Sequence, residues 1–255
     1  MKMPVLFIAH GSPMNAIATN KYTKTLNLLG EKTPTPKAIL CISAHWQTKG
    51  TKIVGVEKPE VIYDFSGFPE ELYQVQYPAK GSPEFAEKTQ KLIFKSEIVH
   101  NWGLDHGAWS VLKHLYTNAN IPVFQMSINT SLNEDGHFQV GKNLQKLRES
   151  GVLILGSGNI VHNLRKIKWN NDDGPFDWCV RFDEKIRDAL LKKSRDEILR
   201  YKILFNEDAQ LSVPTDEHYL PLIYCLGAAL PEDQISFPYE GYEMGSLSMR
   251  SVMWS

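Results

Sequence analysis

The sequence predicts an α/β fold: a single three-layer αβα domain with a central, mostly parallel or mixed sheet. Two observations lead to this prediction. Strand-like apolar runs alternate with amphipathic helical stretches along the 255 residues, which is typical of strands joined by crossover helices. Several of the strand-like runs are continuously apolar, as expected when both faces of a strand are covered. No linker, internal repeat or composition shift divides the chain, so we expect residues 1–255 to form one domain.

The elements can be assigned in order along the chain. The expected strands are Pro4–Ala9, Ala38–Ser43, Lys52–Val56, Ile121–Ile128, Gly151–Leu155 and Glu243–Val252. The expected helices are Ser82–Phe94, Trp109–Thr117, Phe138–Glu149 and Phe176–Lys193, with a further one opening near His218. Ser82 suits the N-cap of its helix because Pro83 is favoured at the first helical position.

An aromatic-rich stretch without a clear period runs from Pro59 to Pro78. Loops of this length are usually functional or disordered, and the aromatic content argues against disorder. We interpret it as a wall or lid over a site. Tyr73, Tyr77, Phe65 and Phe68 are candidates for its lining.

Bulk properties exclude several function classes. The formal net charge is -1, so the composition does not indicate the basic surface that binds nucleic acid or an anionic membrane. No apolar run is long enough to span a bilayer, and the first run ends in a histidine and not in a cleavage site. Three widely spaced cysteines, with no C-x-x-C, suggest neither a disulfide framework nor a thiolate zinc site. The chain is therefore expected to be cytoplasmic.

Four histidines stand where an apolar run gives way to polar residues or where a helix opens: His10, His45, His162 and His218. Ligands of an open α/β sheet bind beyond the carboxyl ends of its strands, and three different strands would deliver His10, His45 and His162 to that edge. Neutral imidazole is the commonest metal ligand in proteins. The pattern predicts one metal site, although each histidine taken alone could be a buried structural residue.

Neighbouring residues add further candidates. Glu217 offers a carboxylate beside His218, so this locus could donate either type of ligand. His106 lies in a tryptophan-bracketed loop, WGLDHGAWS, that is typical of an active-site turn. Ser12 beside His10 is a weak nucleophile candidate because no G-x-S-x-G elbow surrounds it. His100, His114 and His137 are expected to be structural or exposed to solvent.

Several motifs agree in order and spacing with a known family. HGSP (10–13), SAHW (43–46), WGLDHG (102–107), SGN-x-VHN (157–163), T-x-EHYLP (215–221) and EMGSLSM (243–249) resemble the DOPA-dioxygenase-type extradiol dioxygenases of bacteria and plants. The resemblance runs from residue 4 to about residue 250. These enzymes belong to the class III extradiol ring-cleaving superfamily.

The resemblance implies a function and a set of roles. It implies cleavage of a catechol such as DOPA by both atoms of O2, giving a muconic semialdehyde. It implies that His10, His45 and His218 hold one divalent metal. His162 is implied as a fourth ligand in the zinc-containing bacterial members, and as the catalytic acid and base in the wider superfamily. His106 matches a histidine that contacts substrate or oxygen.

One departure from the superfamily bears on the metal. Its iron site usually has two histidines and a glutamate, whereas His218 stands at the matched third position. An imidazole in place of a carboxylate raises the positive charge of the site by one, which favours Zn²⁺ as the resident metal. Fe²⁺ is nevertheless expected for oxygenase chemistry, because Zn²⁺ has no redox chemistry.

Two other functions stay open at this stage. A zinc-dependent hydrolase would use metal-bound hydroxide, with His162 or Glu217 as the base. A non-catalytic member of the superfamily would use the cleft for binding alone, since fold does not fix function. The expected partners are a small aromatic diol and O2, with no nucleic acid and no membrane, and the oligomeric state is open.

Overall fold

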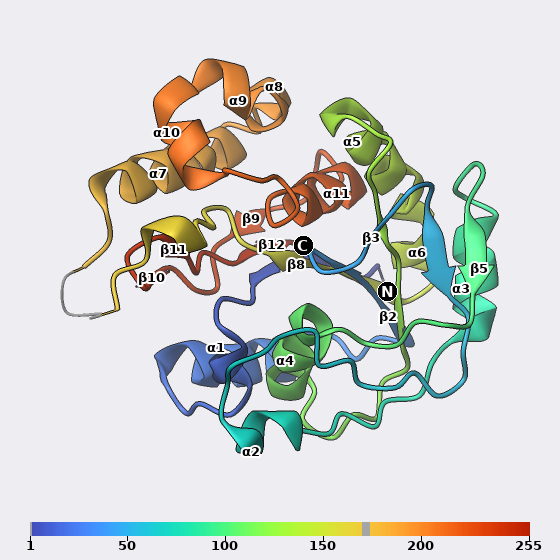
Figure 1. The fold of residues 1–255 in the computed structure, drawn as a ribbon. Helices are drawn as coiled ribbons and strands as arrows, with labels where there is room; N and C mark the ends of the chain where they lie inside the picture. Colours follow the sequence, from blue (N-terminus) through green and yellow to red (C-terminus); the bar gives the residue numbers. More distant parts are fainter. Residues whose placement is uncertain (1, 170–173) are drawn as a thin grey trace.

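The computed structural model describes residues 2–169 and 174–255 and has a central six-stranded sheet with helices on both faces (Figure 1). The strand order is β6-β2-β8-β1-β12-β9. The first four strands are parallel, and the last two run antiparallel to their neighbours. Their bounds are β6 Val123–Gln125, β2 Ala38–Ser43, β8 Val152–Gly158, β1 Val5–Ala9, β12 Val252–Trp254 and β9 Ile235–Ser236. The expected three-layer fold with a mostly parallel, mixed sheet is confirmed.

Alternation along the strands divides the core into two layers. Leu6 and Ile8 of β1 belong to the core beneath α1 (Lys21–Lys32) and α4 (His106–Leu115). Val5 and Phe7 belong to the opposite core, which is covered by α5 (Glu134–Asn143), α7 (Asp177–Leu191) and α11 (Leu220–Ala228). The central strands are buried on both faces, which is why their sequences are continuously apolar.

The remaining elements are short. The helices are α2 Glu70–Tyr73, α3 Pro83–Gln90, α6 Gln145–Glu149, α8 Arg195–Leu199, α9 Tyr201–Leu204 and α10 Asn206–Ser212, with 3-10 turns at Pro13–Ala16 and Leu164–Lys166. Three small two-stranded sheets pair β3 (Gln47–Thr48) with β7 (Ile128–Asn129), β4 (Lys52–Val54) with β5 (Glu97–Val99), and β10 (Tyr242–Glu243) with β11 (Leu247–Ser248). None of the helices described is long and apolar enough to cross a membrane.

Three of the expected strands differ from those observed. Ile121–Ile128 is interrupted, because β6 pairs with β2 in the central sheet whereas β7 pairs with β3. Lys52–Val56 shortens to β4, which lies outside the central sheet. Glu243–Val252 is not one strand: Met244 and Gly245 adopt positive φ angles of 52° and 73°. The chain therefore turns back after Glu243, and only Val252 begins the sheet strand β12.

The glycine-rich segment after Leu155, where the expected strand ended, is still part of the strand. β8 continues to Gly158, because Ser157 and Gly158 pair with Ile8 and Ala9 of β1. Glycine is required there by packing. A Cβ on Gly158 would lie 2.1 Å from the carbonyl oxygen of His218. The glycines let the segment that begins α11 lie directly against the end of β8.

Expected helix boundaries moved where side chains cap the helix. The helix expected from Trp109 begins at His106, because the Asp105 side chain accepts a hydrogen bond from the backbone N–H of Ala108. The helix expected from Phe138 begins at Glu134 after an Asn133 cap, and a break at Leu144 divides it into α5 and α6. A capping side chain satisfies backbone donors that the first turn leaves free.

Candidate metal centre

Adjacent parallel strands bring three of the histidines to one edge of the sheet. β2, β8 and β1 lie side by side, and His45, His162 and His10 follow their carboxyl ends. His218 reaches the same place from the segment before α11, which packs on β8. The expected convergence is thus observed, and His106 at the start of α4 joins it.

The five imidazole rings form one cluster. The centroid of the His10 ring lies 4.9 Å from the centroid of the His45 ring, 5.2 Å from that of His218 and 5.7 Å from that of His106. The His162 ring stacks on His218 at 3.5 Å with an interplanar angle of 6°. The potential ligand atoms of His10, His45 and His106 lie within 4.8 Å of one another, as do those of His162, Glu217 and His218. His10, His45 and His106 form a possible metal site, and His162, Glu217 and His218 form a second group beside it.

Two ring nitrogens face each other at the centre of the cluster. Nε2 of His10 lies 3.1 Å from Nε2 of His45. Nδ1 of His10 contacts Ser157 Oγ at 2.9 Å, and that hydroxyl donates its own proton to the Gly107 carbonyl at 2.5 Å. Ser157 must therefore accept the Nδ1 proton of His10. Because a neutral ring carries one proton, Nε2 of His10 is left with a lone pair.

His218 is oriented in the same way. Its Nδ1 lies 3.1 Å from Oε1 of Glu217, which favours the proton on Nδ1. Its Nε2 is buried and has no hydrogen-bond partner among the described residues. Backbone contacts hold this position, since Asn159 N donates to the His218 carbonyl at 2.8 Å. Glu217 thus orients His218 through its other nitrogen, and a buried lone pair remains available to a ligand.

His162 is held from both sides of its backbone. Its N–H donates to the Ser212 carbonyl at 2.9 Å, and Ser248 N donates to the carbonyl of the preceding Val161 at 3.1 Å. Ser246 binds the next residue, with Oγ donating to the Asn163 carbonyl at 2.9 Å. The β10–β11 hairpin therefore fixes the segment that carries His162.

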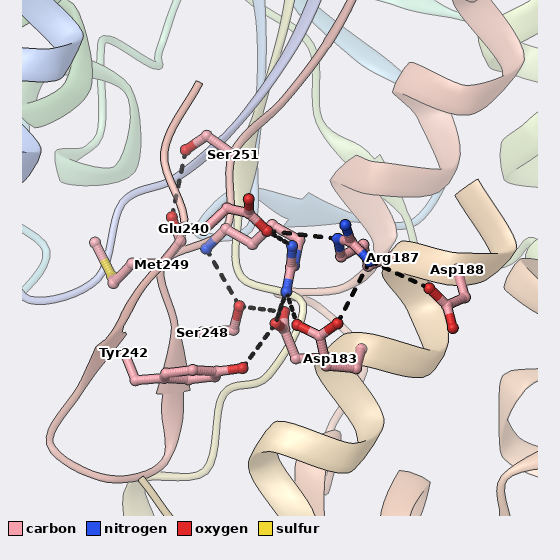
Figure 2. A network of polar contacts seen from close by, with 10 residues as sticks. Asp183, Arg187, Asp188, Glu240, Tyr242, Ser248, Met249 and Ser251 are labelled. Carbon is pink, nitrogen blue, oxygen red and sulfur yellow. Dashed lines mark hydrogen bonds and ion pairs between the residues drawn. The ribbon is translucent and has the colours of Figure 1, made fainter. Parts of the chain in front are cut away.

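A buried ionic network ties that hairpin to α7 (Figure 2). Asp183 accepts hydrogen bonds from Tyr242 at 3.0 Å, Ser248 at 2.5 Å and Arg250 at 2.6 Å. Arg250 is 2% exposed and also contacts Glu184 and Glu240. A buried, fully hydrogen-bonded pair is strongly directional, so the network holds Ser248, and with it the His162 segment, in one position.

His106 occupies the first residue of α4, beneath the aromatic-rich stretch. Its cap Asp105 is fully buried and accepts hydrogen bonds from Ser43 and Gln125 at 2.7 and 2.8 Å. The Phe65 ring packs edge-on against His106 at 5.4 Å. The interpretation of this stretch as a wall is supported here. Tyr77, in contrast, is buried and donates to the Tyr116 carbonyl at 3.2 Å.

Asp64 is the residue that reading of the sequence missed. Ser43, two residues before His45, contacts the His45 backbone and not the ring: its Oγ accepts the His45 N–H at 3.2 Å. Asp64 Oδ2 lies 3.4 Å from Nδ1 of His45, and Oδ1 lies 2.9 Å from Nδ1 of His106. Its only sequence signal is an acidic residue between aromatic ones in YDFSGFP.

Burial lowers the pKa of four of these histidines, namely His10, His45, His162 and His218. Desolvation is the largest cause in each case, lowering the pKa of His45 to about 3 and of His162 to about 4. It also places the pKa of His10 and His218 well below the ordinary value, and neighbouring imidazoles lower both further. Each neutral ring still carries one N–H, so the contact between Nε2 of His10 and Nε2 of His45 holds the Nε2 proton of His45 in one His45 tautomer and two lone pairs in the other. Two lone pairs 3.1 Å apart repel each other unless a cation binds between them.

These residues fit a divalent metal. Two nitrogens that bind one Zn²⁺ tetrahedrally at about 2.0–2.1 Å lie roughly 3.3 Å apart, close to the observed separation. Nε2 of His218 has no hydrogen-bond partner among the described residues, and its ring lies 5.2 Å from that of His10 and 5.0 Å from that of His45. Imidazole suits zinc and iron alike. Carboxylate or hydroxyl partners on the second ring nitrogens are usual for metal-binding histidines.

The other three histidines are placed as expected. His137 is buried, with Nδ1 2.8 Å from the Tyr224 hydroxyl. His114 contacts the Asn15 carbonyl through Nε2 at 2.8 Å. His100 is exposed. None of them belongs to the five-histidine cluster.

Comparison with known proteins agrees with the site. The family described as the catalytic LigB subunit of aromatic ring-opening dioxygenase matches residues 4–246. The 4,5-DOPA dioxygenase extradiol of Escherichia coli K12 is 44% identical over 98% of this chain and 94% of its own. That of Beta vulgaris is 38% identical over 98% and 95%. The crystal structure of an uncharacterized protein from Escherichia coli K12 matches with a TM-score of 0.87 and 40% identity, covering 100% of both chains.

Proposed function

The chain belongs to the LigB family of aromatic ring-opening dioxygenases and is an extradiol enzyme of the DOPA-dioxygenase type, and from this premise we propose its substrate, metal and site residues. We propose a catechol as substrate, with DOPA the first candidate, cleaved with O2 to a muconic semialdehyde. The substrate proposal is supported by the relatives named 4,5-DOPA dioxygenase extradiol. The observation that carries the site proposal is the approach of Nε2 of His45 to 3.1 Å from Nε2 of His10, whose lone pair is fixed by the Ser157 contact to its Nδ1.

The proposed metal ligands are His10, His45 and His218, with His162 at the border between ligand and base. His106, though near enough to His10 and His45 to bind the same ion, is proposed to contact substrate or oxygen. Zn²⁺ is the proposed resident metal because every proposed ligand is a neutral imidazole. Bound Fe²⁺ would supply the one-electron chemistry that couples a catechol to O2, which Zn²⁺ cannot.

The histidines themselves would manage protons. With its pKa lowered to about 4, His162 is neutral at physiological pH and can accept a proton from a catechol hydroxyl. A catecholate bound beside the ring would stabilise the imidazolium and raise that pKa, so the proton could later be returned. Phe65, edge-on to His106, offers an apolar surface to the aromatic ring of the substrate.

The test is metal analysis followed by anaerobic loading with Fe²⁺. Oxygen uptake and a yellow product should then appear with DOPA, protocatechuate or a simpler catechol. Zn²⁺-loaded protein is the control and should consume no oxygen. If Fe²⁺-loaded protein leaves every catechol unchanged, the proposed reaction is wrong.

The rest of the proposal concerns the context of the enzyme. We propose one catalytic domain over residues 1–255, supported by the family match across residues 4–246. We propose a cytoplasmic location, supported by three free, buried cysteines. The proposed partners are the small aromatic diol and O2.

A further inference from the structure

Asp64 is a carboxylate that touches two of the clustered histidines at once. It lies in the aromatic-rich stretch, and its side chain is 21% exposed. Oδ1 accepts the backbone N–H of His106 at 2.9 Å and lies 2.9 Å from Nδ1 of the same residue. Oδ2 lies 3.4 Å from Nδ1 of His45. No side chain of this stretch is part of the proposed metal site, so Asp64 would act on it through the two rings.

We propose that Asp64 is a positioning residue that fixes the tautomers of His45 and His106 and thereby sets the affinity of the metal site. This inference rests on the proposed function of the histidine cluster. It goes further by giving the wall segment a role in metal binding.

The physical reason is the sign of the charge next to each Nδ1. Neither Nδ1 has the geometry of a hydrogen bond to Asp64, so the effect is one of charge: a carboxylate attracts an N–H and repels a lone pair, which favours the proton on Nδ1 in both rings. Nε2 of His45 is then the lone pair that faces Nε2 of His10 at 3.1 Å. Without the carboxylate, the proton of His45 could move to Nε2 and occupy the position of the metal.

Asp64 also fixes the backbone. His106 is the first residue of α4, and its N–H is one of the donors that a helix start leaves unsatisfied. By accepting that N–H, Asp64 joins the start of α4 to the wall segment. Phe65, the next residue, packs on the His106 ring with the ring centroids 5.4 Å apart, and this apolar contact also holds the wall segment against the start of α4.

Glu217 is the second carboxylate beside the cluster. It lies 3.1 Å from Nδ1 of His218, and a ligand atom of His162 lies within 4.8 Å of it. Loss of its charge should act mainly on His218. Loss of the Asp64 charge should weaken the ligand His45 and also disturb His106, so metal affinity and turnover should both change.

The experiment compares Asp64→Asn, Asp64→Glu and Glu71→Gln with the full-length wild-type chain. Affinity for Zn²⁺ and Co²⁺ is measured by competition with a chromophoric chelator, and the visible absorption of the Co²⁺ form is recorded. Asp64→Asn should weaken affinity roughly 10- to 100-fold and change the Co²⁺ spectrum, as loss of such partners does. Asp64→Glu keeps the charge and should recover part of the affinity. Glu71 is exposed in the same stretch, so its substitution should change neither readout.

Two outcomes would overturn the proposal. One is that Asp64→Asn matches the wild-type metal affinity within twofold and has an unchanged Co²⁺ spectrum. The other is that Asp64→Glu binds the metal more weakly than Asp64→Asn. Melting of the metal-free variants in EDTA checks that each is folded, and a partly exposed side chain leaves no buried void when replaced. The metal-affinity measurements contain no catechol. If the wild-type enzyme failed to cleave catechols, the proposed reaction would be wrong, but the role of Asp64 in metal binding would still be decided by these measurements.

Discussion

Substitution of Gly158 by alanine tests whether close packing of β8 sets the position of His218. A Cβ at Gly158 would lie 2.1 Å from the His218 carbonyl oxygen, whereas real Cβ contacts are not shorter than 3.0 Å. The two segments must therefore separate by at least about 0.9 Å. Metal–ligand distances tolerate only about 0.2 Å. A misplacement near 1 Å costs about 10²-fold in activity, and overpacking costs roughly 1–3 kcal/mol of stability.

The assay for Gly158→Ala separates the site from the fold. Zn²⁺ affinity, measured against a chromophoric chelator, should fall at least about tenfold, while urea unfolding in EDTA gives the loss of stability. Gly156→Ala is the matched control, because its Cβ would lie 2.5 Å from Cys225 Sγ and 2.8 Å from the Pro221 carbonyl oxygen, away from His218. It should lose stability but keep its metal affinity. Wild-type affinity in Gly158→Ala, or an equal loss in Gly156→Ala, would refute the reasoning.

Three further predictions concern single side chains. His10→Ala should abolish stoichiometric Zn²⁺ binding in metal analysis, and full occupancy would show that the ligand assignment is wrong. His162→Ala should retain metal but lose about 10²–10⁴-fold in turnover of the Fe²⁺-loaded enzyme, and near-normal turnover excludes an acid–base role. The third prediction concerns Asp233. Burial raises the pKa of its carboxyl group, but hydrogen bonds from Arg148 and Lys2 outweigh this and hold the pKa below the ordinary value. This stabilisation is present above about pH 4 and is lost as pH falls through the folded pKa. Asp233→Asn leaves the Arg148 charge buried, so it should cost roughly 3–5 kcal/mol in urea unfolding and flatten the acid side of the stability profile. An unchanged profile would contradict the pKa direction.

The sequence predicted those parts of the site that depend on strand ends. His10, His45 and His162 could be placed because apolar runs stop just before them, and parallel strands carry their carboxyl ends to one edge. His106 could be noticed from its loop. These signals are local: a short stretch of sequence shows both the type of the residue and its place at the end of a strand or in a loop.

Long-range packing was not visible in the same way. The expected strand stopped at Leu155, before Gly156 and Gly158, because glycine weakens a strand interior, but here Gly158 permits the close approach of His218, 60 residues later. The segment from Glu243 suggested one strand because the positive φ of Met244 has no sequence signature. The contacts of Asp64 could not be predicted because its partners, His45 and His106, are distant from it along the chain.

The placement of β1 has a consequence for the order of folding. Val5 pairs with Ile154 on one side and with Trp254 on the other, so the first strand completes its hydrogen bonds only with residues made much later. Pairings so distant in sequence impose a large loop-closure cost and slow folding. His10 follows directly on this strand, so a chain emerging from the ribosome should hold no metal until β12 has docked. Metal capture should accordingly be a late event in refolding, slower than the formation of the helices.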